Sequence, residues 1–219
     1  MLPRVLEPEV MDSADEARDY DAMDHAQVNR VFVADFLACG PADGAILDVG
    51  TGTAQIPIEL CRQSMTASVV AVDLAEHMLC LGRTNVHRAG FADRIRLEKV
   101  DAKHLPFAEG TFAAVISNSI VHHIPAPAGV LTEMTRVLAS GGTIFVRDLL
   151  RPDDDAAVRQ LVQLYAGDAN AHQQKMFDDS LRAALTLAEI RALVADLGFP
   201  APSVQQTSDR HWTWAGRKP

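Results

Sequence analysis

Cysteine is scarce in this sequence. The three cysteines, Cys39, Cys61 and Cys80, are an odd number and form no C-x-x-C pair. Disulfide-stabilised secreted domains and cysteine zinc sites both depend on cysteines at paired spacings. The sequence therefore argues against both classes, and we expect the three thiols to be buried.

Long apolar runs are also missing. No run approaches the roughly 18 apolar residues of a membrane-spanning helix. The first ten residues, MLPRVLEPEV, lack the basic start and the apolar stretch of a signal peptide. We therefore expect no membrane span and a cytoplasmic location.

Positive charge is in short supply as well. The 20 Lys and Arg residues are outnumbered by 29 Asp and Glu residues, which gives a formal net charge of −9. Such a charge repels nucleic-acid phosphates, and the sequence shows no local basic cluster that would overcome the repulsion. We expect no nucleic-acid partner; a small-molecule or protein substrate is favoured, and the oligomeric state is left open.

What the chain does contain is a regular alternation of strand-like and helix-like segments. The strand-like segments are 45–50, 68–74, 95–102, 112–119 and 143–150, and helical patterns lie between most of them. Alternation at this pace is typical of βαβ units and of a parallel sheet. We therefore predict a doubly wound α/β fold.

The N-terminal part has a different pattern. Residues 12–38 carry apolar side chains at helical spacing, and a Cys-Gly-Pro sequence ends that pattern at residues 39–41. We predict a helical segment over residues 1–40 and a single domain over residues 41–219.

The last third begins with a helical stretch near residues 154–165, and a polar connector follows. A second helix starts at a capping-box pattern of Thr186 and Glu189 and ends at Gly198. The final residues, in which Trp212 and Trp214 alternate with polar residues, are typical of an exposed terminal strand.

The stretch ILDVGTGTAQ at residues 46–55 places glycines directly after the first predicted strand. Dinucleotide sites use the pattern G-x-G-x-x-G, but here Gln55 stands at the third glycine position. Asp48 lies two residues before Gly50, where a carboxylate suits a cation better than a diphosphate. The pattern therefore favours a positively charged ligand without phosphates.

Two further acids lie at strand ends. Asp73 ends the second predicted strand, where an acid can accept both hydroxyls of a ribose. Asp101 ends the third and can accept a hydrogen bond from an exocyclic amine. Together with Asp48, these acids outline one adenosine with a cationic tail.

Four motifs in this order give the chain a specific resemblance to a known family. They are LDVGTGTA at 47–54, VDLAEHML at 72–79, VDAKHLPF at 100–107, and FAAVISNSIVHHI with LTEMTRVLASGGTIFVRD over 112–148. The sequence resembles class I S-adenosylmethionine-dependent methyltransferases, in particular the ubiquinone and menaquinone biosynthesis C-methyltransferases of the small-molecule branch. The resemblance covers residues 45–150 well and the rest in outline.

The resemblance implies a mostly parallel, seven-stranded Rossmann-like sheet, with residues 1–40 as a helical lid and S-adenosyl-L-methionine as cofactor. It implies Asp48, Gly50 and Gly52 around the methionine part of the cofactor and Asp73 on the ribose. The other implied cofactor-binding residues are Leu74, Met78, Asp101, Ala102, Asn118 and, from the lid, Tyr20.

The acceptor side is less well defined. By resemblance, His122 points towards the acceptor and His123 packs inside, so His122 is a candidate catalytic and substrate-binding residue. His25 in the lid is a second candidate for a catalytic base, and Arg147 is a candidate clamp for an anionic substrate. We expect no metal ion, because neighbouring residues at a helix start point about 100° apart and do not easily share one.

The expected function is in-line transfer of a methyl group from the cofactor to a small-molecule acceptor. Four alternatives are weighed against it. Asp48 and Gln55 argue against a nicotinamide dehydrogenase, and the sequence Ser-Asn-Ser-Ile at 117–120 lacks the Pro-Pro-aromatic segment of nucleic-acid base methyltransferases. A non-catalytic binding module, or a methyltransferase that acts on a protein, stays open.

Overall fold

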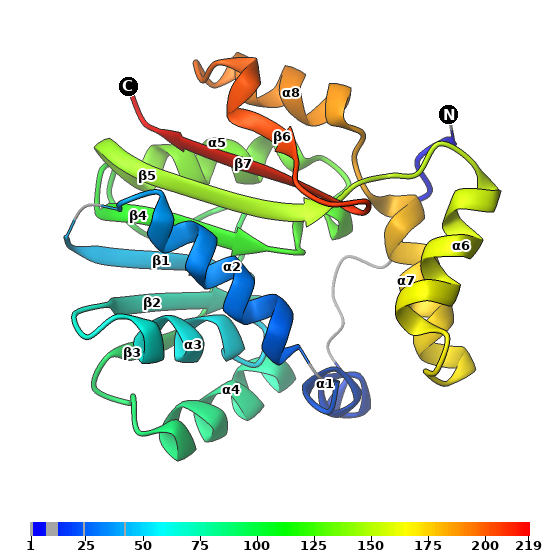
Figure 1. Ribbon diagram of the computed structural model, residues 1–219. Coiled ribbons are helices and arrows are strands. Elements are labelled where there is room, and N and C mark those ends of the chain that lie inside the picture. The colour runs from blue at the N-terminus through cyan, green and yellow to red at the C-terminus, as the bar shows by residue number, and fades with distance from the viewer. Residues whose placement is uncertain (1, 8–12, 24, 42) are drawn as a thin grey trace.

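One seven-stranded sheet organises the chain. The computed structural model describes residues 2–7, 13–23, 25–41 and 43–219. The strands are β1 (Ala45–Val49), β2 (Ser68–Asp73), β3 (Ile95–Lys99), β4 (Phe112–Asn118), β5 (Leu138–Leu149), β6 (Val204–Gln206) and β7 (His211–Arg217). Their order across the sheet is β3-β2-β1-β4-β5-β7-β6. Strands β1 to β5 pair in parallel, and β7 runs antiparallel between β5 and β6, as Figure 1 shows. The predicted doubly wound, mostly parallel, seven-stranded sheet is confirmed.

Helices cover both faces of this sheet. They are α1 (Ala14–Asp21), α2 (Ala26–Ala38), α3 (Gln55–Gln63), α4 (Glu76–Ala89), α5 (Pro127–Val137), α6 (Asp155–Ala166), α7 (Ala171–Ala183) and α8 (Leu187–Asp196), with the short 3₁₀ helices η1 (Val121–His123) and η2 (Ala201–Ser203). One apolar cluster joins α2, α3 and α4 to the sheet, and a second joins α5 and α8 to the opposite face. Strands in the middle of the sheet are buried on both faces, and β4 and the second half of β5 are accordingly buried almost throughout.

Helix α2 is attached to the sheet by aromatic packing. Phe32 and Phe36 are fully buried, and their rings lie 5.1 and 6.0 Å from the ring of Phe145 on β5. Burying each phenylalanine contributes about 1.5–3 kcal/mol, and its replacement by alanine costs about 3–5 kcal/mol. Residues 26–38 therefore belong to the core, although they were expected to be part of a lid segment.

The structure corrects three details of the sequence interpretation. The helical pattern of residues 12–38 is interrupted between α1 and α2, and the expected polar connector contains helix α7, which starts at a capping box of Asn170 and Gln173. Of the cysteines, only Cys61 is buried.

The expected exposed terminal strand is a further correction. Trp212 and Trp214 are fully buried because β7 has a neighbouring strand on each side and helix α8 above it (Figure 1). The capping box of Thr186 and Glu189 is confirmed at the start of α8.

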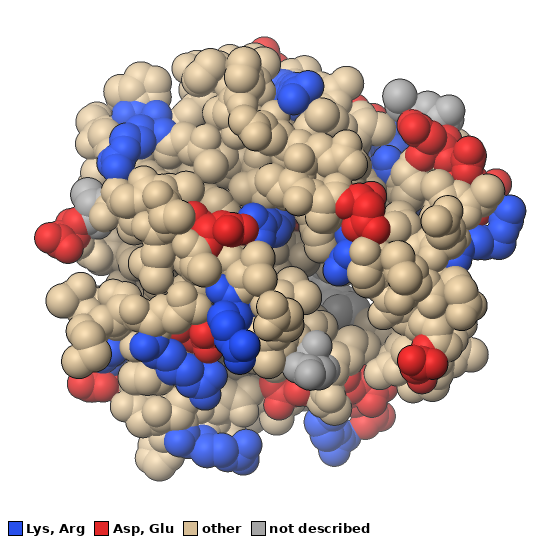
Figure 2. All heavy atoms as spheres, in the orientation of Figure 1, with Lys and Arg blue, Asp and Glu red and all other residues tan. Residues whose placement is uncertain are grey.

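Two surface properties bear on possible partners. Among the described residues, no helix combines the length and the apolar character needed to cross a membrane. On the face shown in Figure 2, Lys and Arg side chains are interspersed with Asp and Glu side chains.

The change of direction in strand order lies between β1 and β4. Strands added after β1 extend the sheet one way, through β2 and β3, whereas β4 and β5 extend it the other way. In open α/β sheets, ligands bind beyond the carboxyl ends of the strands at this point. Residues 50–52 and 118–120 leave the sheet there.

Candidate functional site

An open cavity lies beyond the carboxyl ends of β1, β2, β3 and β4. The residues that line it are Tyr20, Gly50, Gly52, Val72, Asp73, Leu74, Ala75, Met78, Val100, Asp101, Ala102, Lys103, Asn118, Ser119, Ile120, His123 and Ile124. Nine of the ten residues expected to bind the cofactor are among them; Asp48 is the exception. The structure thus brings together residues from four strand ends and from helix α1.

The glycine turn after β1 forms one wall of this cavity. Gly50 has a φ of +76°, and its N–H donates to the carbonyl of Val72 at 2.8 Å. A β-carbon at Gly50 would overlap the side chain of Ile120, which follows β4. Gly52 also has a positive φ, +55°. Only glycine adopts these backbone angles without strain and leaves the turn this close to its neighbours.

Asp73 ties the end of β2 to that turn. Its carboxylate accepts hydrogen bonds from the N–H groups of Gly52 at 2.7 Å and of Ala75 at 2.9 Å. Burial raises the pKa of Asp73, although these backbone donors act in the opposite direction. Each carboxylate oxygen has a second lone pair, so Asp73 can still accept two hydroxyl groups of a ligand.

Asp48 lies at the end of β1, beneath the glycine turn and 1% exposed. Burial raises the pKa of Asp48 to about 7, and the nearby charge of Asp73 adds to the effect. Its Oδ2 atom is buried and makes no hydrogen bond with any described residue. A buried carboxylate of this kind gains most from a positively charged ligand, because such a ligand supplies the missing counter-charge.

The remaining expected cofactor residues form the other walls. Leu74 and Met78 provide an apolar surface after β2, and Asp101 and Ala102 follow β3. Burial opposes ionisation of Asp101, but hydrogen bonds from Lys103 outweigh it, so the pKa of Asp101 is lowered. Asn118 ends β4 on the opposite side of the cavity.

Helix α1 covers this site. Ala17 on α1 packs against Ala75 and Met78, with Tyr20 beside them. A β-carbon at Gly52 would lie 3.6 Å from Cε1 of the Tyr20 ring, so the ring sits directly over the turn. Burial raises the pKa of Tyr20 to about 12, with Asp73 and Asp48 contributing. The phenol is therefore neutral and can act as a hydrogen-bond donor in the cavity.

The two adjacent histidines of η1 occupy different surroundings from those expected. His122, expected to face the acceptor, is 3% exposed and places Nδ1 2.5 Å from Oδ1 of Asp148. His123, expected to be a packing residue, lines the cavity. The orientation expected for this pair is therefore reversed. The physical reason is the buried acid Asp148 at the end of β5, which draws His122 inward.

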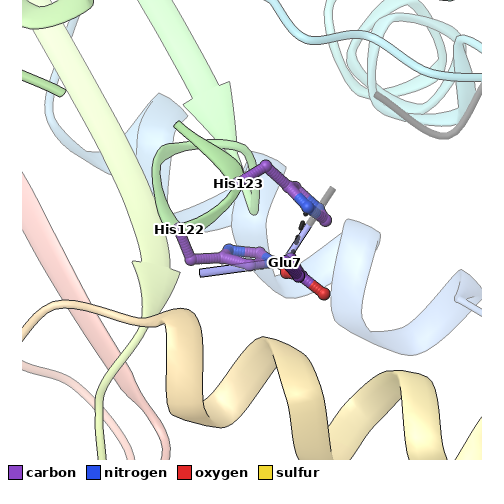
Figure 3. A group of neighbouring side chains, drawn as sticks. All are labelled: Glu7, His122 and His123. Atoms are coloured by element: carbon purple, nitrogen blue, oxygen red, sulfur yellow. Dashed lines mark ion pairs between the residues drawn. The ribbon is translucent and has the colours of Figure 1, made fainter. Parts of the chain in front are cut away.

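The N-terminal segment reaches the same place. Glu7 Oε1 lies 3.0 Å from Nδ1 of His123 and 3.6 Å from Nε2 of His122, as Figure 3 shows. The two imidazole rings are 4.1 Å apart at an angle of 36°. The expectation that neighbouring histidines point too far apart to share an ion rested on regular helical geometry. The turn at η1 instead brings both rings to one carboxylate.

Two other acceptor-side candidates lie outside the cavity. Arg147 donates to Asp35 at 2.7 Å and to Thr213 at 2.9 Å, and stacks over Phe32 and Phe145. These contacts anchor α2 to the sheet. Successive side chains of β5 alternate between the two faces of the sheet, so Arg147 faces α2 whereas Asp148 faces η1. This position does not support the expected role of Arg147 as a clamp for an anionic substrate.

His25 is the other candidate outside the cavity. It packs 4.9 Å from the Tyr20 ring and lines a separate hollow between α2, α3 and α4. His25 does not reach the cavity wall, so its position does not support the expected role as a catalytic base.

Comparison with known proteins relates this geometry to methyltransferases. A family model described as a methyltransferase domain matches residues 47–146, somewhat less than half of the chain, from within β1 to within β5.

Curated relatives agree with the match. The chain is similar to the ubiquinone/menaquinone biosynthesis C-methyltransferase of Geobacter sulfurreducens, with 29% identity over 71% of the chain and 64% of the relative. It is 38% identical to the enzyme of the same name from Geobacter sp. strain M21, over 50% of the chain and 47% of that relative. The chain thus spans between about half and two thirds of the curated relatives it matches.

Solved structures agree with the fold. A candidate S-adenosyl-L-methionine-dependent methyltransferase from Methanococcus maripaludis superposes with a TM-score of 0.72 at 17% identity, over 98% of each chain. A SAM-dependent methyltransferase from Aquifex aeolicus gives 0.67 at 16% identity, over 93% of this chain and 97% of that one. The chain therefore shares the Rossmann-like fold of these two structures.

Sequence reasoning missed three residues of the cavity region. Asp148 carries a signal, since it is an acid at the end of an otherwise apolar strand. Ile120 follows β4 in a sequence without special composition, and Glu7 is separated by more than 100 residues from the histidines that it meets. Neither offers a local pattern, because both gain their place through tertiary structure.

Proposed function

We propose that the protein transfers a methyl group from S-adenosyl-L-methionine to a small-molecule acceptor. One observation carries the proposal: the carboxylate of Asp48, whose Oδ2 atom is buried without a hydrogen bond of good geometry to a described residue, lies beneath the same cavity that Asp73 and the glycine turn border. A cation with a ribose satisfies both acids at once. The family match and the named relatives support this reading.

The described residues fit this cofactor. Asp48 supplies negative charge under the turn, where the ammonium of the methionine part would lie. Asp73 has lone pairs left for the ribose hydroxyls. Apolar contacts from Leu74 and Met78 suit the faces of an adenine, and the Asp101–Ala102 segment suits its amino edge. A dinucleotide fits less well, because its diphosphate would meet Asp48 and Asp73.

The protein's part in the reaction is mainly alignment and exclusion of water. When bound, the cofactor supplies an activated methyl group on a sulfonium. The residues of this chain need only hold donor and acceptor in line and keep the site dry. Tyr20 and helix α1 close the cavity over the glycine turn, while Asn118 and His123 border its other side.

A proton acceptor is needed only if the acceptor molecule arrives protonated. His123 is the histidine on the cavity wall, so we assign it the acceptor-facing position that the sequence interpretation gave to His122. His122 is buried behind it and positions η1 through Asp148.

The substrate class follows from the relatives by analogy. Proteins similar to this chain are named for C-methylation in quinone biosynthesis and as a demethylmenaquinone methyltransferase. We propose a small acceptor with a nucleophilic carbon or oxygen, of which an aromatic diol is the first choice.

Turnover tests the proposal. The full-length protein is incubated with methyl-labelled S-adenosylmethionine and with reduced naphthoquinones, reduced benzoquinones, catechols and amines in turn. We expect acceptor-dependent S-adenosylhomocysteine, and little with the Asp73→Ala variant. Cofactor binding without turnover on any acceptor would support a non-catalytic module. Label transferred to added protein instead would identify a protein methyltransferase.

A further inference from the structure

Three metal-ligating side chains from distant parts of the chain meet beside the cavity. They are Glu7 from the N-terminal segment and His122 and His123 from η1 (Figure 3). One ligand atom from each lies within 4.8 Å of the other two. The proposed methyl transfer makes no use of Glu7, so the cluster calls for its own explanation.

Two of the three separations between these atoms suit a small metal ion. Glu7 Oε1 is 3.0 Å from His123 Nδ1 and 3.6 Å from His122 Nε2. With metal–ligand bonds of about 2.0–2.1 Å, these separations correspond to angles at the metal of about 95° and 120°. Those angles lie on either side of the tetrahedral value of about 109° that zinc prefers.

Hydrogen bonding leaves the facing atoms available. Glu7 Oε1 and His123 Nδ1 are both buried, and among the described residues their one contact at hydrogen-bond distance is the 3.0 Å ion pair with each other. The three side chains are only 12%, 3% and 19% exposed, in the order Glu7, His122, His123. Buried ligand atoms that converge with no further partner are stabilised by a cation between them.

Asp148 prepares His122 for such a role. With Nδ1 of His122 2.5 Å from its carboxylate, the imidazole donates its Nδ1 proton there and presents the Nε2 lone pair towards Glu7. Asp148 is itself held by the N–H groups of Val121 and Leu149. A carboxylate behind a histidine is the usual support of a zinc-bound imidazole.

Glu7 is also held in place from outside the cluster. Its second carboxylate oxygen accepts a hydrogen bond from Ser180 at 3.3 Å. Arg4 donates to the carbonyl oxygens of His122 and Ile124, each at 3.0 Å, and the N–H of Val5 donates to the carbonyl oxygen of Arg182. The segment therefore reaches η1 through contacts that do not depend on the ion.

We propose that Glu7, His122 and His123 form a binding site for a divalent transition-metal ion, with zinc as the ion that fits best. Two imidazoles and one carboxylate suit zinc, and three protein ligands leave a fourth position for water or a ligand. Because His123 lines the cavity, the ion lies at its edge and links residues 2–7 to η1. This proposal does not depend on the assignment of the cofactor.

Metal titration tests the site directly. The full-length protein is treated with a chelator, dialysed, and titrated with zinc in competition with a chromophoric chelator at pH 7.5. We expect one zinc ion per chain. The variants Glu7→Gln and His123→Ala should bind zinc at least tenfold more weakly, and circular dichroism confirms that they are folded.

The exposed His87 on α4 provides a matched control, and His87→Ala should bind zinc like the parent. Cobalt(II) in place of zinc gives a second readout, since its visible absorption depends on the ligands. Parent-like zinc affinity in both Glu7→Gln and His123→Ala, or no stoichiometric binding by the parent, would overturn the proposal. Loss of the cobalt spectrum in both variants would support it, whether or not the protein transfers methyl groups.

Discussion

The carboxylate of Asp73 accepts a hydrogen bond from the N–H of Gly52 at 2.7 Å. This bond joins the end of β2 to the glycine turn after β1, so one acid both shapes the turn and faces the cavity. Asp73→Ala should weaken S-adenosylhomocysteine binding by about 1.5–3 kcal/mol, because charge-assisted hydrogen bonds are lost. It should also lower the melting temperature of the ligand-free protein, since Gly52 and Ala75 lose their acceptor. Calorimetry and a thermal melt measure the two effects; an unchanged affinity would exclude Asp73 as the ribose partner.

The pKa of about 7 for Asp48 predicts pH-dependent cofactor binding. A cationic ligand needs the ionised carboxylate, so its apparent dissociation constant should rise about tenfold from pH 8 to pH 6. Asp48→Asn should bind more weakly at pH 8 and lose most of this dependence. Binding titrations of both proteins at three pH values provide the measurement. The same pH dependence in Asp48→Asn would mean that another group is responsible.

The raised pKa of Asp48 also has a consequence for stability without ligand. The group binds its proton more tightly in the folded state than in the unfolded state, where its pKa is 3.8. Its contribution is therefore fully present below about pH 4 and is lost as the pH rises through about 7. Asp48→Asn should stabilise the ligand-free protein at pH 8 by up to about 4 kcal/mol, measured by denaturant unfolding. A loss of stability at pH 8 would contradict this account of Asp48.

Gly50 and Ile120 should be coupled in a double-mutant cycle. Gly50→Ala places a methyl group where Ile120 already lies and imposes a φ of +76° on alanine, so both cofactor affinity and melting temperature should fall. Ile120→Ala in the same chain should recover part of the stability, because it removes the overlap but not the backbone strain. Differential scanning calorimetry of the four proteins gives the coupling. If the effects of the two substitutions on stability were strictly additive, backbone strain alone would account for the destabilisation by Gly50→Ala.

Tyr20 tests the lid. Its ring lies over Gly52, and Tyr20→Ala should raise the dissociation constant of S-adenosylhomocysteine about tenfold with little change in circular dichroism. The other tyrosine, Tyr165, is exposed on α6 and is the matched control. Parent-like binding by Tyr20→Ala would make helix α1 a packing element rather than a lid.

The sheet and the cofactor side of the site were accessible from sequence because their signals are local. The apolar strands, the glycine pair and the acid at each strand end can each be recognised from a few neighbouring residues. The same holds for the capping box that begins α8. These residues converge because parallel strands end at one edge of the sheet.

The acceptor side was not accessible in this way. The pattern of two histidines is the same whichever ring faces the cavity, and only Asp148, 26 residues beyond His122, decides it. Helix α7 was missed because it has few apolar residues and depends on its capping box and on packing of Leu181. Trp212 and Trp214 looked like an exposed strand because burial on β7 comes from β6 and α8.

The most direct test of the account is calorimetry of the full-length protein with S-adenosylhomocysteine and, separately, with NAD. The cavity offers carboxylates to a ribose and to a cation, so we predict one S-adenosylhomocysteine per chain with a micromolar dissociation constant, roughly −8 kcal/mol, and no comparable binding of NAD. Tighter binding of NAD, or no binding of S-adenosylhomocysteine, would contradict the proposed cofactor and with it the proposed function.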